Sequence, residues 1–128
     1  MPKKSFEDLI EIAKKLRSDT GCPWDRKQTI QSMLKYIDEE VSEVREAIEN
    51  VDHPNLCEEL GDVLFQLVMI AQIAKEEGHF DINDVISGIE KKLISRHTWV
   101  FGEDRAETPE EALEMWKRNK KIEKSKKK

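Results

Sequence analysis

The feature that most constrains the fold is a pair of long apolar stripes with helical spacing. Between residues 29 and 50 the apolar side chains recur every three or four positions, from Ile30 through Ile48. That spacing places them on one face of an α-helix, and no segment alternates with the two-residue period of a strand. A second stripe, over residues 55–77, is apolar on nearly all sides, which predicts a helix buried against several neighbours. The chain is therefore predicted to be all-α.

Helix start signals predict three further helices. Ser5 with Asp8 three positions later is typical of a capping box, so the first helix is expected to begin there. It is broken at residues 19–25, which we expect to form an ordered loop. Asp81 begins a fourth helix, and Pro109 begins a short C-terminal one. The expected architecture is a bundle of four main helices plus this short helix.

Composition limits the size of the core. A chain of 128 residues suits one domain, and 38% of its residues are hydrophobic. That content is too small for several thick helices to bury all their apolar faces within one chain. We therefore expect a homodimer or a homotetramer, in which another subunit packs against the helix at residues 55–77.

Charge is distributed unevenly along the chain. Residues 117–128 hold eight basic residues and one acid, a charge of +7, whereas residues 1–116 carry −12. An acidic body is a poor surface for nucleic acid, so we expect no nucleic-acid partner. The basic end is interpreted as a disordered, solvated tail over residues 121–128, following a domain over residues 1–120.

Neither targeting segments nor cysteines suggest an extracellular or membrane protein. No apolar segment is long enough to span a membrane, and the first residues lack the apolar block of a signal peptide. Cys22 and Cys57 form neither a disulfide framework nor a zinc-binding pair. We expect a cytoplasmic protein with reduced thiols and no membrane partner.

Two acidic segments are the candidates for chemistry, and they spell EEVSE at residues 39–43 and EELGD at residues 58–62. Residues three apart on a helix are neighbours, so each segment presents two carboxylates side by side. Close carboxylates repel one another, and oxygen-only ligands without His or Cys favour Mg²⁺, with Mn²⁺ as a substitute. The alternative is that acidic pairs merely decorate solvated helix faces. The four candidate metal ligands are Glu40, Glu43, Glu59 and Asp62.

Two other residues of these segments behave differently. The helical position of Glu39 points almost directly away from the core. Gly61 lies within a helix, where glycine costs roughly 1 kcal/mol relative to alanine. Its presence suggests close helix approach or tight ligand packing at that point.

Basic and aromatic residues supply candidates for nucleotide contacts. Lys92 and Arg96 are four apart on one helix face and are suited to grip successive phosphates. The alternative is an exposed basic helix end favoured by the helix dipole. Trp24 and Trp116 are candidates to stack on a nucleobase, although a single tryptophan is more often part of a core.

Taken together, these segments resemble the MazG nucleoside triphosphate pyrophosphohydrolases. The likeness covers roughly residues 5–120, and the order and separation of the motifs agree with that family. The matching motifs are GCPWD at residues 21–25, EEVSE at 39–43, EELGD at 58–62, KLISRH at 92–97 and VFG at 100–102.

The resemblance implies a helical dimer or higher assembly with a magnesium site in a four-helix core completed by oligomerisation. It implies metal binding by the four carboxylates named above, with Glu39 as a candidate base. It also implies triphosphate contacts from Lys92 and Arg96, and places Trp116 and Lys120 near the nucleotide.

The sequence departs from the usual family pattern in three places. It carries one copy of the domain, whereas better-known members carry two in tandem. A common Arg-Arg pair is Ser95-Arg96 here, and the usual His-Pro-His-Val-Phe is HTWVF at residues 97–101. These differences bear on substrate breadth and assembly.

The expected activity is Mg²⁺-dependent hydrolysis of nucleoside triphosphates to monophosphate and pyrophosphate, with housecleaning of the nucleotide pool as the expected role. Two alternatives remain open at this point. One is a non-catalytic helical interaction module with solvated acids. The other is a hydrolase of another phosphorylated compound on the same scaffold, since a fold does not determine the leaving group.

Overall fold

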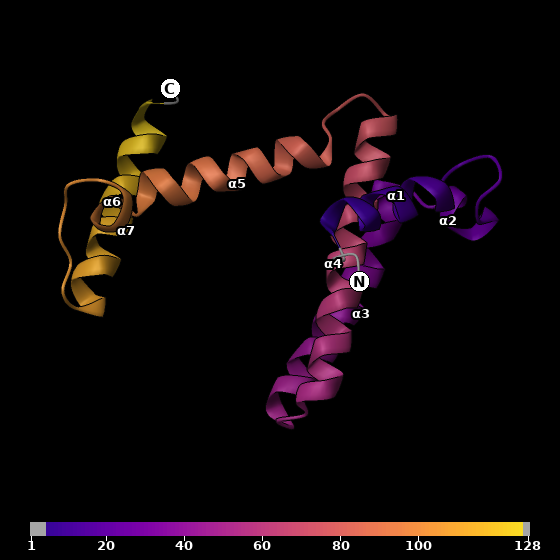
Figure 1. Cartoon of the computed structure of the whole chain (residues 1–128), viewed down its shortest axis with the longest axis horizontal. Coiled ribbons are helices and arrows are strands. Elements are labelled where there is room, and N and C mark those ends of the chain that lie inside the picture. Colours follow the sequence, from indigo (N-terminus) through magenta and orange to yellow (C-terminus); the bar gives the residue numbers. More distant parts are fainter. Residues whose placement is uncertain (1–4, 127–128) are drawn as a thin grey trace. The chain divides into compact units, whose positions relative to one another are not determined.

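The computed structural model describes residues 5–126, and the chain divides after Ile82 into two compact units. Every regular element in the described range is a helix, which confirms the predicted all-α class (Figure 1). None of these helices is both long enough and apolar enough to cross a membrane. The helices of the first unit are α1 (Phe6–Leu16), α2 (Pro23–Lys27), α3 (Ile30–Glu49) and α4 (His53–Glu76).

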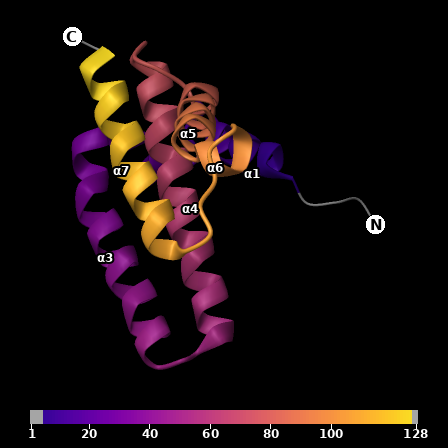
Figure 2. The ribbon, with the colours of Figure 1, turned by 90° about the vertical axis from the view of Figure 1, so that its left-hand side faces the viewer.

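Helices α3 and α4 form an antiparallel hairpin and lie side by side along their length (Figure 2). Thr29 and Ser32 form a capping box at the start of α3, and the Asp52 side chain caps α4 by accepting from the backbone N–H of Asn55. Gly78, with φ of 79°, follows the end of α4 in a conformation that favours glycine. The hairpin sets the register between the two acidic segments.

The core of the first unit lies where α1 packs against the hairpin. The predicted capping box of Ser5 and Asp8 begins α1. The core cluster combines residues of α1, α3 and α4, namely Ala13, Met33, Val68, Met69 and Ile73.

A short helix occupies part of the predicted loop at residues 19–25. Arg17 donates from Nη1 to the carbonyl oxygens of Asp25 at 2.6 Å and Gln28 at 2.8 Å. Its Nη2 also pairs with Glu76 of α4 at 2.6 Å. These contacts hold α2 on the first unit, and Pro23 at its first turn favours helix over loop.

The second unit contains most of α5 (Ile82–Arg96) together with α6 (Thr98–Phe101) and α7 (Pro109–Lys126). Arg96 pairs with Glu123 at 2.6 Å, which joins the end of α5 to α7. Asn119 is buried and donates from Nδ2 to the carbonyl oxygen of Arg96 and to the hydroxyl of Thr98. A polar network therefore holds these three helices together.

The last helix differs from its prediction in length. Pro109 begins it as expected, but α7 has 18 residues rather than being short. Residues 121–126 of the predicted disordered tail form its last turns, because Lys and Glu favour helix and Glu123 is anchored by Ser95 and Arg96. Residues 127–128 lie outside the described part. The domain boundary at residue 120 stays a prediction.

Two expectations concern the packing around α4. Beyond the backbone of its own helix and its two chain neighbours, no atom of the described residues lies within 4 Å of the position that a Cβ on Gly61 would occupy. The expected close helix approach is therefore not found within this chain, and the alternative of tight ligand packing stays a prediction. Part of the apolar surface of α4 stays open, with Leu60 53% and Leu67 50% exposed. The expected second subunit would cover such a surface, and the oligomeric state stays a prediction.

Candidate metal centre

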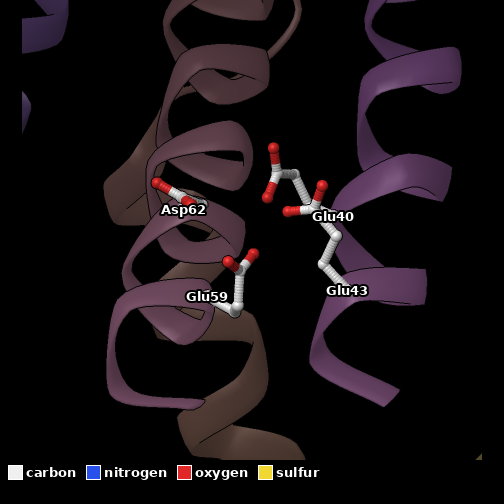
Figure 3. A group of neighbouring side chains, drawn as sticks. All are labelled: Glu40, Glu43, Glu59 and Asp62. Atoms are coloured by element: carbon white, nitrogen blue, oxygen red, sulfur yellow. The ribbon is translucent and has the colours of Figure 1, made fainter. Parts of the chain in front are cut away.

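The hairpin brings the two predicted carboxylate pairs together. Figure 3 shows Glu40 and Glu43 projecting from α3 toward α4, which carries Glu59 and Asp62. Within each pair the spacing of three residues places both side chains on one helix face. One carboxylate oxygen from each of the four lies within 4.8 Å of the others. The cluster therefore forms between residues that are about twenty positions apart in the sequence.

Burial differs among the four side chains. Glu59 is buried, Glu40 is half-buried, and the remaining two are exposed. Two oxygens, Oε2 of Glu40 and Oε2 of Glu59, are buried without a hydrogen-bond partner among the described residues. Buried polar atoms are nearly always partnered, so two such acceptors in one cluster indicate a missing positive or hydrogen-bond-donating group.

The acidic surroundings raise the proton affinity of the cluster. The pKa of Glu59 is raised to about 7, first by its hydrogen bond with Glu43, then by desolvation and by the charges of Glu43, Asp62 and Glu40. Desolvation and the neighbouring charges also raise the pKa of Glu40. Burial and the close approach of the four carboxyl groups thus act together in both shifts, and a bound cation would oppose them.

The donor set fits Mg²⁺. All four candidate ligands are carboxylates, and neither His nor Cys belongs to the cluster found in residues 5–126. Opposite oxygens around Mg²⁺ lie about 4.2 Å apart, because each Mg–O distance is about 2.1 Å. The observed spread of up to 4.8 Å is close to that value. The spacing of the four carboxylates is therefore compatible with such an ion.

Glu39 and Trp24 are both exposed on the surface of the first unit. Glu39 is exposed on α3, consistent with its predicted direction away from the core. Trp24 on α2 is 49% exposed, and its ring packs edge-on against Tyr36 of α3 at 5.2 Å between ring centres. Tyr36 precedes Glu40 by one helical turn, so this aromatic pair adjoins the carboxylate cluster along α3. Sequence reasoning did not identify Tyr36 as the partner of Trp24.

The other predicted nucleotide contacts lie in the second unit. Lys92 is exposed on α5, whereas Arg96 is buried and already engaged. The Arg96 guanidinium pairs with Glu123 and stacks over the Trp116 ring at 5.3 Å. Lys92, Arg96 and Glu123 border a cleft of about 490 Å³, whose rim is basic.

The remaining predicted residue, Lys120, is exposed on α7. Trp116 is half-buried beneath Arg96 and His97, so within this unit it acts first as a packing residue. Glu123 was not among the predicted site residues. Its contacts with Ser95 and Arg96 reveal its importance, because a single acid in a basic run carries no distinguishing sequence signal.

Comparison with known proteins identifies relatives over most of the chain. The family model for the MazG nucleotide pyrophosphohydrolase domain matches residues 28–101, a span that includes the four carboxylates, Lys92 and Arg96. The nucleoside triphosphate pyrophosphohydrolase/pyrophosphatase MazG of Thermotoga maritima is 49% identical over 123 residues, covering 96% of this chain and 47% of that protein. The nucleoside triphosphate pyrophosphohydrolase of Escherichia coli K12 is 44% identical, covering 95% and 47%.

A solved structure extends this similarity to three dimensions. The crystal structure of a mazG-related protein from Thermotoga maritima superposes with a TM-score of 0.75 at 35% identity, covering 90% of this chain and 98% of that chain. The chain spans about half the length of the two pyrophosphohydrolases described above. Because the family model covers more than half of the sequence and the related structure matches nearly throughout, the chain belongs to the MazG nucleotide pyrophosphohydrolase domain family.

Proposed function

We propose that this protein is an Mg²⁺-dependent enzyme that hydrolyses nucleoside triphosphates to nucleoside monophosphate and pyrophosphate. The observation that carries the proposal is the cluster of four carboxylates within 4.8 Å, two of which have buried oxygens without partners. Relatives named nucleoside triphosphate pyrophosphohydrolases support the same reaction. In this reaction water attacks the α-phosphorus, the α–β phosphoanhydride bond breaks, and pyrophosphate departs.

The carboxylates Glu40, Glu43, Glu59 and Asp62 would hold the ion and keep it oriented between α3 and α4. Bound Mg²⁺ supplies charge neutralisation for phosphate oxygens and acidifies water. The protein would supply a partly desolvated binding position. There the positive charge of the cation would replace that of the proton on Glu59. Glu39 is the candidate base, since it is the neighbour of Glu40 in the sequence and its exposed carboxylate is free to accept a proton from water; because its side chain points away from the core, this role would require it to act through an intervening water.

Lys92 and Arg96 are proposed to contact the triphosphate. The Lys92 ammonium is exposed and suited to a single phosphate oxygen, whereas a guanidinium offers two parallel donors. Arg96 would have to exchange its Glu123 partner for phosphate, or share its donors between them. Phosphate binding at this residue is therefore coupled to the position of α7.

The nucleoside is proposed to contact Trp24, Trp116 and Lys120. The half-exposed Trp24 ring offers a face for a base while Tyr36 fixes its orientation. We further propose a homodimer or homotetramer in the cytoplasm, with the exposed leucines of α4 at a subunit interface, and a role in clearing unwanted nucleotides from the pool. Mn²⁺ is expected to replace Mg²⁺, because both accept oxygen ligands.

The test is product analysis with a panel of ribo- and deoxyribonucleoside triphosphates, in the presence of Mg²⁺ or EDTA. The expected products are monophosphate and pyrophosphate, formed only with the metal. In ¹⁸O-labelled water the label should appear in the monophosphate, because the attack is at the α-phosphorus. Release of inorganic phosphate with diphosphate, or label in pyrophosphate, would contradict the proposed reaction.

A further inference from the structure

Three buried side-chain oxygens lack a hydrogen-bond partner among the described residues, and one of them is Oε1 of Gln66 on α4. The other two are Oε2 of Glu40 and Oε2 of Glu59, both in the carboxylate cluster. Among the described residues, every unpartnered buried side-chain atom is thus an oxygen acceptor, and all three belong to the α3–α4 hairpin. All three atoms therefore lack the same kind of partner, which is a hydrogen-bond donor or a cation.

The position of Gln66 on α4 indicates where that partner would lie. Gln66 follows Asp62 by four residues, so the two share one helix face. Helical side chains lean toward the preceding turn, which here is the turn that carries Asp62. The next residues on the same face are Met69 and Ile73, which are buried and offer no hydrogen-bond donor. On this face of α4, the polar neighbours of Gln66 therefore lie on the side of the carboxylate cluster.

We propose that Gln66 is a further positioning residue of the cation site, with its amide oxygen in contact with the hydration shell of the bound ion. This inference rests on the proposed Mg²⁺-dependent function. Mg²⁺ is reluctant to lose water and usually keeps several water ligands when proteins bind it. Each such water is a strong donor, which is the partner that Oε1 of Gln66 lacks.

The proposal predicts opposite effects of Gln66→Met on the apo and metal-bound protein. Methionine has a similar length and carries no amide, so it removes the unpartnered acceptor while filling the same space. Without metal, the Gln66→Met variant should melt at a higher temperature than the wild-type protein without metal. The Mg²⁺ concentration that gives half of the metal-induced shift should rise about ten- to hundredfold, the usual range for residues that support metal ligands.

Two further variants separate metal positioning from a general effect on α4. Gln72→Met is the matched control, because Gln72 also lies on α4 but donates to Glu76 at 3.3 Å, away from the cluster. It should leave the Mg²⁺ dependence unchanged. Gln66→Glu keeps an acceptor oxygen and adds negative charge, so it should retain Mg²⁺ binding while lowering the melting temperature of the apo protein.

The measurement is thermal unfolding of the full chain in EDTA and across an MgCl₂ titration, without nucleotide. A weaker Mg²⁺ response in Gln66→Met alone, combined with its higher apo melting temperature, supports the proposal. An unchanged Mg²⁺ response in that variant, beside a normal wild-type response, overturns this inference and leaves the proposed function standing. Absence of any Mg²⁺ response in wild type overturns both.

Discussion

The carboxylate cluster of the first unit and the paired acids of the second unit differ in their charge partners. In the second unit, Arg96 is paired with Glu123 at 2.6 Å, and Arg118 is paired with Asp104 at 2.5 Å. In the first unit, the four clustered carboxylates form no ion pair with any residue of the described range. Acidic side chains are therefore paired where the chain supplies a cation, as Arg17 does for Glu76 in the first unit, whereas the clustered carboxylates have no cationic partner among the described residues.

The pKa values of Asp104 and Glu59 differ in the same way as their charge partners. Hydrogen bonds from Thr98 and Arg118 hold the pKa of Asp104 below its usual value. The pKa of Glu59 is raised to about 7 instead, because its hydrogen bond with Glu43, its desolvation and the nearby charges all favour the protonated form. Asp104 is stabilised as an anion by its own chain. Glu59 keeps its proton up to about pH 7, because none of its neighbours in the cluster carries a positive charge.

The largest expected effect on stability comes from breaking the built-in pair. Arg96→Met should lower the free energy of unfolding of the second unit by about 3 kcal/mol, because it leaves Glu123 without its guanidinium partner and removes the stack on Trp116. Urea unfolding followed by tryptophan fluorescence measures this loss. An unfolding free energy close to that of wild type would show that the Arg96–Glu123 pair contributes nothing to stability. That result would contradict the contrast between this pair and the carboxylate cluster.

Metal addition should have the next largest effect, and on the first unit only. A ligand at 100 times its dissociation constant stabilises a native state by about 2.7 kcal/mol. Saturating MgCl₂ should therefore raise the unfolding free energy of the first unit by about this amount, and EDTA should reverse it. Hydrogen exchange of α3 and α4 amides reports the change locally. Equal protection of α7 amides would argue against a site in the carboxylate cluster.

A smaller effect of opposite sign distinguishes Glu59 from Asp104. Without metal, Glu59→Gln should raise the melting temperature, because it removes one charge from a repelling group and keeps a hydrogen-bonding side chain. Asp104→Asn should lower the melting temperature, because it weakens contacts with Thr98 and Arg118. Differential scanning calorimetry in EDTA compares the two variants. A change of melting temperature in the same direction for both variants would contradict the contrast between Glu59 and Asp104.

The pH dependence of the apo protein follows from the raised pKa of Glu59. The folded state holds the proton up to about pH 7, whereas the unfolded state releases it near the ordinary value of 4.5. The stability linked to this proton is present below pH 4.5 and is lost as pH rises through 7. Melting temperatures of wild type and Glu59→Gln in EDTA should therefore diverge across this window. Parallel curves would contradict the shift.

The smallest effect concerns Gly61, which lies between Glu59 and Asp62. Within residues 5–126, no atom outside its own helix backbone and chain neighbours lies within 4 Å of the position of an added Cβ, so Gly61→Ala should stabilise α4 by up to roughly 1 kcal/mol. Gly78→Ala is the matched control and should destabilise, since Gly78 has φ of 79°. Light scattering checks assembly in parallel. Destabilisation by Gly61→Ala together with loss of an oligomer would show that the glycine is required at a subunit contact.

The sequence predicted those features that depend on local pattern. The capping signals of Ser5 and Pro109 begin the helices as expected, and the long apolar stripe over residues 29–50 corresponds to α3. The spacing of three within each acidic pair, together with the hairpin that joins α3 to α4, explains why the four carboxylates meet. Their role as metal ligands stays a prediction.

The features that sequence reasoning missed depend on distant contacts. Helix α2 has five residues, too few for a periodic pattern, and Arg17 holds it in place from α1's C-terminal end. Arg96 and Glu123 are 27 positions apart, so no local motif marks them as a pair. The unpartnered oxygen of Gln66 is visible only when burial is known atom by atom.

The most direct test of the central claim is pyrophosphate release by wild type and Asp62→Asn, each with saturating Mg²⁺ and with EDTA. Asp62 is exposed, so its amide variant should keep the helical circular dichroism spectrum of wild type. We predict metal-dependent release by wild type and no detectable release by the variant, because one of four clustered ligands is lost. Wild-type rates in a folded Asp62→Asn protein would contradict the account that this carboxylate cluster is the catalytic cation site.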